Sequence, residues 1–104
     1  MAVEFWTMAN PKFLDGASEA VRAEEVGYDG IVYVDSQNLA GDCYVAIALA
    51  AQATSTIKLG TGVTNSFTRH PAVTASAIAT LQVASGGRAY LGIGRGDSAL
   101  AHLG

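Results

Sequence analysis

The sequence contains one cysteine, two prolines and no excess of basic residues among its 104 positions. Because Cys43 has no second cysteine to pair with, an internal disulfide is impossible, which favours a reducing compartment, and we expect the cytoplasm. The formal net charge of −3, with lysine and arginine scattered singly, argues against a nucleic-acid surface, which requires a basic patch. No charged-then-apolar leader opens the chain and no apolar run approaches the roughly 18 residues of a membrane helix, so we expect neither secretion nor a membrane span.

Metal-binding and nucleophile signatures are also missing. The two histidines and Cys43 do not fall at zinc-ligand spacing, so we expect no bound metal. We expect His70, directly before Pro71, to orient the start of a helix instead. The chain has neither a phosphate-binding G-x-x-x-x-G-K-S/T loop nor a G-x-S-x-G nucleophile elbow.

What the sequence does contain is a strand-to-helix unit that recurs four times. Comparable strand positions are Val3, Ile31, Leu59 and Tyr90, about 28 to 31 residues apart, and each apolar run leads into a polar loop. Strands that alternate with helices predict an α/β fold with a parallel sheet, either a (β/α) barrel or an open, doubly wound sheet. The period does not separate these two architectures.

We expect a single domain over residues 1–104, made of four such units with the fourth helix cut short. The expected strands are Val3–Trp6, Gly30–Val34, the run from Leu59 to Val63, and Arg88–Ile93. The expected helices run from Pro11 or Asp15 to Val26, from the cap Asp42 to about Ala53, from Pro71 to Ser85, and from Ala99 to Gly104 as a first turn only.

The stretch from Lys58 to Pro71 joins a buried strand directly to a polar loop. Gly60 and Gly62 leave the strand backbone unshielded by side chains, so a flat polar ligand could lie against it. The loop then offers the hydrogen-bonding side chains of Thr64, Asn65, Ser66, Thr68, Arg69 and His70. Because the carboxyl ends of parallel strands meet at one edge of a sheet, we expect this loop to share that edge with Asp35 and Asp97.

Four pieces of the chain, in this order, resemble the bacterial luciferase-like family. They are Lys-Leu-Gly-Thr-Gly-Val-Thr-Asn (58–65), Thr-Arg-His-Pro-Ala (68–72), Ser-Gly-Gly-Arg (85–88) and Leu-Gly-Ile-Gly-Arg-Gly-Asp-Ser-Ala (91–99). The resemblance is nearest to the deazaflavin branch, the methylenetetrahydromethanopterin reductase-like enzymes. It implies a TIM (β/α)8 barrel that binds coenzyme F-420 or FMN at the C-terminal ends of its strands. Such an enzyme exchanges hydride with a small organic substrate, or in other branches activates oxygen.

The same resemblance implies roles for Gly62, Val63, Asp35 and Asp97. Gly62 and Val63 would form a cis non-prolyl peptide, a bulge that backs the central ring of the cofactor. Asp35, after the second strand, and Asp97, after the fourth, would be the two carboxylates of the pocket and the catalytic candidates. The remaining cofactor-binding candidates are Thr64, Asn65, Gly94 and Gly96.

Several of these residues also have a purely structural interpretation. Asp35 could bond its own backbone in a loop, and Thr64 and Asn65 could satisfy their loop as well as bind the polar edge of the cofactor. If Asp35 exchanges a proton during hydride transfer, it needs a pKa moved toward neutrality by burial. Ser36 stands where one sugar-phosphate-oxidising branch carries a histidine, which argues against a histidine-based mechanism of that kind.

Length and one motif leave further alternatives open. The family's barrel has eight units on about 250 residues, so this chain would be its N-terminal half, with strand edges that favour a homo-oligomer or pairing with a missing C-terminal half. It could also be a non-enzymatic half-barrel assembly module. The loop Gly94-Arg-Gly-Asp-Ser-Ala99 matches the G-x-G-x-x-A dinucleotide fingerprint, which would indicate an NAD(P)-dependent dehydrogenase with an open Rossmann sheet.

Overall fold

A computed structural model of the chain describes residues 2–13, 15–101 and 103. Its main sheet contains four parallel strands in the order β1 (Trp6–Ala9), β2 (Gly30–Tyr33), β3 (Lys58–Thr61) and β5 (Ala89–Tyr90). A second parallel pair, β4 (Thr64–Asn65) and β6 (Ile93–Gly94), follows β3 and β5 along the chain. The helices are α1 (Ser18–Glu25), α2 (Cys43–Ala53), α3 (Pro71–Ala84) and the short α4 (Asp97–Ala101).

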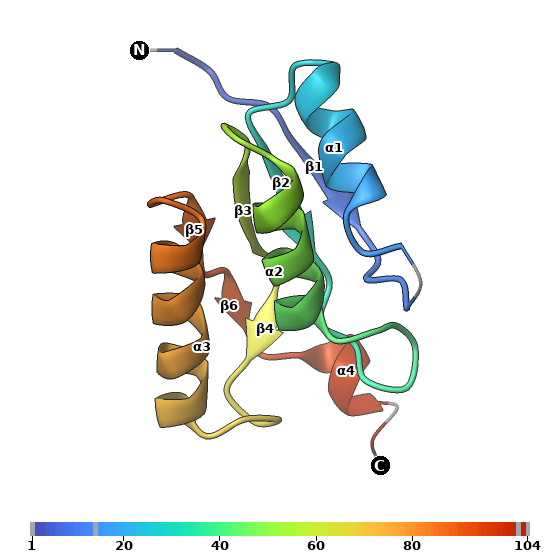
Figure 1. Ribbon diagram of the computed structural model, residues 1–104. Helices are drawn as coiled ribbons and strands as arrows, with labels where there is room; N and C mark the ends of the chain where they lie inside the picture. Colours follow the sequence, from blue (N-terminus) through green and yellow to red (C-terminus); the bar gives the residue numbers. More distant parts are fainter. Residues whose placement is uncertain (1, 14, 102, 104) are drawn as a thin grey trace.

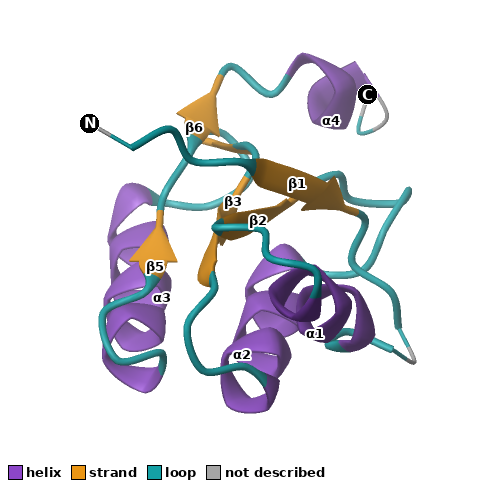
Figure 2. Cartoon of the chain, turned by 90° about the horizontal axis from the view of Figure 1, so that it is seen from above, coloured by secondary structure: helices purple, strands orange, loops and turns teal. Residues whose placement is uncertain are grey.

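The strands lie side by side in chain order, and α1, α2 and α3 all cover the same face of the sheet (Figure 1, Figure 2). A doubly wound sheet reverses its strand order at a switch point and carries helices on both faces. Sequential parallel strands with their helices on one side are instead the arrangement of a TIM-barrel wall. The structure therefore confirms the predicted α/β class and favours the barrel over the open sheet.

The hydrophobic core lies between the sheet and these three helices. Its main strand side chains are Ile31, Tyr33 and Leu59, each at most 1% exposed. The helices contribute Ala20, Ala23, Ile47, Ala50 and Leu81. Burying an aliphatic side chain of the size of Ile or Leu contributes about 1.5 to 3 kcal/mol. Cys43 belongs to this core as a free thiol, and burial raises its pKa to about 12.

On the face of the sheet opposite the helices, two aromatic side chains pack against each other. Trp6 of β1 and Tyr90 of β5 meet edge to face, with ring centroids 5.2 Å apart. The register places Gly30 beside Trp6 and Gly60 beside Tyr90, and a Cβ on either glycine would overlap its neighbour. Side chains from the two outermost strands can touch because the sheet curves, as the wall of a barrel must.

Two N-terminal boundaries differ from the sequence prediction. The first strand is predicted at Val3–Trp6 but lies at Trp6–Ala9, because its pairing with β2 begins with Trp6 opposite Gly30. The first helix is predicted from Pro11 or Asp15 but begins at Ser18. The Asp15 carboxylate accepts hydrogen bonds from the Ser18 hydroxyl (2.6 Å) and backbone N–H (3.3 Å), a local turn that delays the helix.

The third and fourth strands each break where one continuous strand is predicted. β3 ends at Thr61, before Val63, and the range Arg88–Ile93 divides into β5 and β6 around Gly92. At the break the Thr61 hydroxyl donates to the Gly92 carbonyl oxygen (2.8 Å) and accepts from the Gly92 N–H (2.9 Å), so a side chain replaces the backbone ladder. The fourth helix begins at Asp97 rather than Ala99, and positions 102 and 104 of its predicted range lie outside the described residues.

Both predicted helix starts near the polar loops are confirmed. The Asp42 carboxylate accepts from the Val45 N–H at 3.0 Å and caps α2. His70 caps α3 through Nδ1, which accepts from the Ala72 N–H at 3.1 Å, and Pro71 is the first helical residue. Within the described part of the chain, no helix has the length and apolar character needed to cross a membrane.

Candidate functional site

The loops that follow β2, β3 and β6 meet at the C-terminal edge of the strands. They surround a cavity of about 430 Å³ lined by Val34, Asp35, Ser36, Gly62, Val63, Arg95, Gly96 and Asp97. The other large hollows lie on the helix side, between β1 and α1 and between α2 and α3. The cavity at the strand ends therefore gathers the polar loop residues on one edge, as the strand pattern predicts.

Five of the eight predicted site residues line this cavity, and three lie beneath it. Asp35, Gly62, Val63, Gly96 and Asp97 contribute to its wall. Thr64 and Asn65 are buried in β4, and Gly94 pairs with Asn65 in β6. The β4–β6 pair thus adjoins the cavity without lining it: the Thr64 hydroxyl donates to Asp35 in the wall, and the Asn65 side chain lies against Gly96.

Gly62 and Val63 form the part of the wall that continues β3. Their peptide bond is cis, as the family resemblance implies. The Gly62 N–H donates to the Tyr33 carbonyl oxygen at 2.8 Å, and a Cβ on Gly62 would overlap Val32. The Val63 side chain is 47% exposed, so this segment presents an apolar isopropyl group and bare backbone to the cavity. Its contact with a cofactor ring stays a prediction.

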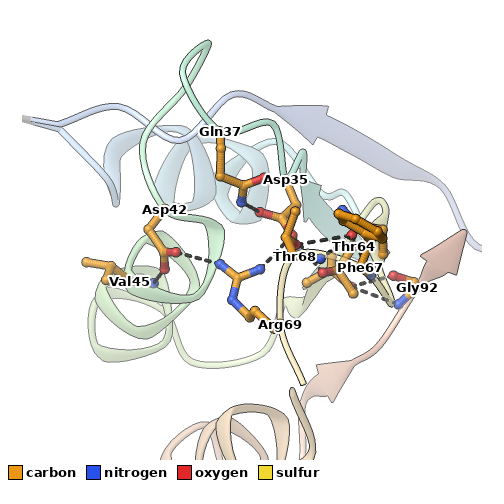
Figure 3. Close-up of polar contacts among 11 residues, drawn as sticks. Asp35, Gln37, Asp42, Val45, Thr64, Phe67, Thr68, Arg69 and Gly92 are labelled. Atoms are coloured by element: carbon orange, nitrogen blue, oxygen red, sulfur yellow. Dashed lines mark hydrogen bonds and ion pairs between the residues drawn. The ribbon is translucent and has the colours of Figure 1, made fainter. Parts of the chain in front are cut away.

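Asp35 is held from three directions in the cavity wall (Figure 3). Its Oδ2 accepts from the Thr64 hydroxyl at 2.6 Å and from Arg69 Nη1 at 2.7 Å, and its Oδ1 accepts from Gln37 Nε2 at 2.6 Å. The Asp35 side chain is only 1% exposed. Its carboxylate is therefore fixed in position and saturated with donors.

The pKa of Asp35 moves away from neutrality, the direction opposite to the one that proton exchange by this residue would need. Burial by itself raises the pKa of this carboxyl, but the hydrogen bonds from Thr64, Arg69 and Gln37 and the Arg69 charge outweigh burial and lower the pKa below its ordinary value. The condition stated for proton exchange by Asp35 is therefore not met, because Arg69, 34 positions later in the chain, supplies a charge that outweighs burial. Asp35 is ionised at neutral pH.

Arg69 is the residue whose importance the sequence pattern did not single out. It appears there only as one of six polar residues in the loop after β3. In the structure its Nη2 also donates to Asp42 Oδ1 at 2.7 Å, and its guanidinium lies 4.5 Å from the centre of the Tyr44 ring. The one signal in the sequence was the position of Arg69 within the Thr-Arg-His-Pro-Ala piece that resembles the luciferase-like family.

Arg95 and Asp97 form the exposed lip of the cavity. Arg95 Nη2 pairs with Asp97 Oδ2 at 2.8 Å, and their side chains are 87% and 74% exposed. Gly96 between them has a φ of +79°, which favours glycine, and a Cβ there would fall 2.6 Å from Asn65 Cβ. Asp97 is thus an exposed carboxylate with one ion-pair partner, whereas Asp35 is buried and held by three donors. Among the described residues, no cluster of three or more His, Cys, Asp or Glu side chains could hold a metal ion.

The family model for luciferase-like monooxygenases matches residues 5–103. The chain belongs to this family. It is 47% identical over 83 residues to the 5,10-methylenetetrahydromethanopterin reductase of Methanolobus tindarius, a match that covers 80% of this chain and 25% of that protein.

Two solved structures show how the luciferase-like fold is shared. The coenzyme F-420-dependent tetrahydromethanopterin reductase of Methanopyrus kandleri superposes with a TM-score of 0.87 at 37% identity, covering 99% of this chain and 30% of the other. The FMN complex of the oxygenating constituent of 3,6-diketocamphane monooxygenase, from a Pseudomonas putida plasmid, gives 0.76 at 28% identity, covering 90% and 30%. The chain thus spans a quarter to a third of the length of these relatives.

Family membership resolves the alternative raised by the Gly94–Ala99 loop. The nicotinamide-dependent reading requires an open Rossmann sheet, whereas the chain belongs to a barrel family and its strands run in sequential order. The loop follows β6 and carries the exposed Asp97 carboxylate where a pyrophosphate would need to bind. The dinucleotide fingerprint is therefore a coincidence of glycine spacing.

Proposed function

We propose that this chain is the N-terminal part of an oxidoreductase that binds coenzyme F-420 in the cavity at its strand ends and exchanges hydride with a small organic substrate. The observation that carries the proposal is the Gly62–Val63 segment, an exposed apolar side chain on bare backbone at the end of a buried strand. The similar reductase structure from Methanopyrus kandleri is that of a coenzyme F-420-dependent enzyme, which supports F-420 as the cofactor. The activity of the complete protein is part of this proposal.

The residues around the cavity fit a flat heterocycle with polar edges. Two buried amide atoms near the cavity, Gln37 Oε1 and Asn65 Nδ2, have no hydrogen-bond partner within the described structure. Asn65 Nδ2 lies directly under Gly96, 3.0 Å from the place a Cβ would take. One unpaired acceptor and one unpaired donor beside an apolar wall suit a ring system that carries both amide N–H and carbonyl groups.

When bound, F-420 supplies a ring carbon that accepts or releases hydride. The chain's own residues would then position that ring and hold its surroundings. Val63 would supply the apolar contact to the ring, Asp35 would add a fixed negative charge to the wall, and the exposed Asp97 carboxylate would contact substrate or exchange a proton at its Oδ atoms. Asp35 and Asp97 are therefore proposed for different tasks, the first electrostatic and the second direct.

FMN is the second cofactor candidate. The FMN-bound monooxygenase constituent shares the fold of this chain at 28% identity, so the same strand ends accommodate a flavin in that protein. Its isoalloxazine ring has the same flat, polar-edged outline as a deazaflavin. With FMN the chemistry would be oxygen activation rather than reversible hydride exchange.

The proposal also covers partners and location. We propose that the chain acts as a homo-oligomer or together with the rest of a barrel, because within the described residues β1 pairs only with β2 and β5 only with β3. A cytoplasmic location is supported by the unpaired, buried Cys43, which a reducing compartment keeps free.

Fluorescence titrations of the protein with F-420, FMN and NADP test this proposal. We expect saturable binding of F-420, weaker binding of FMN and none of NADP. Val63→Ala should weaken F-420 binding several-fold because it removes the apolar contact, whereas the matched change Val83→Ala on the far end of α3 should leave it unchanged. A protein that binds none of the three but forms a defined oligomer would support the non-enzymatic assembly module instead.

A further inference from the structure

Arg69 joins three parts of the chain that lie far apart in the sequence. It comes from the loop between β4 and α3, yet it contacts Asp35 after β2, Asp42 at the start of α2 and the Tyr44 ring within α2. Its side chain is 15% exposed, so these contacts are largely shielded from water. Arg69 does not line the cavity itself.

The geometry requires an arginine rather than any cation. Nη1 donates to Asp35 and Nη2 donates to Asp42, each at 2.7 Å, while the guanidinium carbon lies over the Tyr44 ring, 4.5 Å from its centre. A lysine ammonium is a point charge without a planar face and cannot reproduce this fork and stacking together. The other carboxylate oxygen of Asp42 accepts from the Val45 N–H and caps α2. Arg69 therefore also holds the residue that caps this helix.

We propose that Arg69 is the positioning residue of this site: it holds the Asp35 carboxylate in the cavity wall and fixes the start of α2 to the loop that follows β4. Without Arg69, the buried Asp35 would keep only the neutral donors Thr64 and Gln37, and its position would relax. The inference rests on the proposed function, because it assigns Asp35 as a fixed charge facing the cofactor.

The groups that face Asp35 are few and can be named. Arg69 contacts it from the β4–α3 loop, Cys43 approaches it from the start of α2, and Asp42 lies on the other side of Arg69. Cys43 stays neutral because burial, reinforced by the Asp35 charge, raises its pKa to about 12. Arg69 is therefore the one cation that compensates Asp35 among the groups that touch it.

Carbon-detected NMR titration of the Asp35 carboxyl carbon tests the inference in the complete protein. In Arg69→Gln the titration midpoint should rise by about one pH unit or more relative to the unaltered protein, since an opposite charge at this distance is removed. Hydrogen exchange at the Val45 amide should accelerate in the same variant. The matched change Arg22→Gln, at an exposed position of α1, should alter neither measurement.

Arg69→Lys keeps the inference testable if Arg69→Gln does not fold. A lysine can pair with only one of the two carboxylates. In Arg69→Lys, one of the two measurements, the Asp35 titration midpoint or the Val45 amide exchange, should therefore match the unaltered protein while the other differs from it. An unchanged Asp35 midpoint in Arg69→Gln, or a lysine variant identical to the unaltered protein in both measurements, would overturn the role of Arg69.

The cofactor measurement separates this inference from the proposed function. If the unaltered protein binds F-420, Arg69→Gln should lower its affinity about tenfold, the scale of one charge-assisted hydrogen bond. Failure of the unaltered protein to bind F-420 would overturn the proposed function, and the Asp35 titration would still decide whether Arg69 holds this carboxylate.

Discussion

Glu24 accepts four hydrogen bonds through one carboxylate oxygen. Its Oε2 lies 2.7 to 3.0 Å from the backbone nitrogens of Ser55, Thr56 and Ile57, and 3.2 Å from the Thr56 hydroxyl. These bonds, led by the one from the Thr56 backbone and opposed by burial, lower the pKa of Glu24 to about 2. A residue near the end of α1 thereby fixes the segment that leads into β3.

Because the folded-state pKa of Glu24 lies below its ordinary value of 4.5, its contribution to stability is full above about pH 5 and disappears as the pH falls toward 2. Glu24→Gln should therefore lower the free energy of unfolding at pH 7 by about 1 to 2 kcal/mol, reduced from a fully buried case by solvent screening. Urea unfolding at several pH values measures this. A difference between the two proteins that persists undiminished at pH 2 would contradict the assignment.

Gly30 is required by the indole ring that lies over it. A Cβ at this position would overlap the Trp6 ring, so Gly30→Ala should destabilise the protein by about 1 to 3 kcal/mol through overpacking. Thermal unfolding measures the loss. Trp6→Leu in the same protein should recover part of it by removing the overlap, and a double variant that shows no such coupling would mean that the two residues do not meet.

At the scale of the elements, Arg88 joins the C-terminal ends of two helices. Neither α2 nor α3 has a basic residue in its last turn. Arg88 instead donates to the carbonyl oxygens of Ala51 and Thr54 at the end of α2, of Ser85 at the end of α3, and of Ile57 before β3. One guanidinium thus satisfies unpaired carbonyl groups and complements both helix dipoles.

Arg88→Met should lower the free energy of unfolding by about 2 to 3 kcal/mol, since it keeps the apolar stem and removes the charged donors. Differential scanning calorimetry should show the loss as a lower Tm. Arg22→Met, at an exposed site on α1, is the matched control and should shift the Tm little. Equal Tm values for the two variants would refute the capping role.

The elements themselves could largely be predicted because their signals are local. The helix starts at Asp42 and Pro71 follow from capping chemistry, and the second strand from an unbroken apolar run. The late start at Ser18 follows from a local turn with Asp15, a signal that the sequence prediction missed. The break at Gly92 could not be predicted, since it depends on a hydrogen bond from Thr61, 31 positions earlier, which only the fold brings into reach. The same limit applies to the site. Its residues cluster as the strand pattern predicts, but the pKa of Asp35 depends on Arg69, which the fold brings into contact.

At the scale of the whole molecule, the sheet has two open edges and an exposed inner face. Met8 and Ile93, from β1 and β6, are 64% and 56% exposed. We expect light scattering to give a mass above that of one chain, with Met8→Lys shifting the protein toward the monomer because an edge lysine blocks strand pairing. Val83→Lys, on the helix side, is the control. A monomeric parent protein, or dissociation by Val83→Lys alone, would contradict association through the sheet.

The central claim is that the strand ends, and the Gly62–Val63 segment above all, hold the ring of a deazaflavin. The most direct test is a titration of the isotope-labelled protein with F-420 followed by NMR. We expect saturable shifts at the amides of Val63, Gly96 and Asp97, with residues of the α2–α3 surface unaffected. Shifts confined to the helix side of the sheet, or none at Val63 when F-420 is bound, would contradict it.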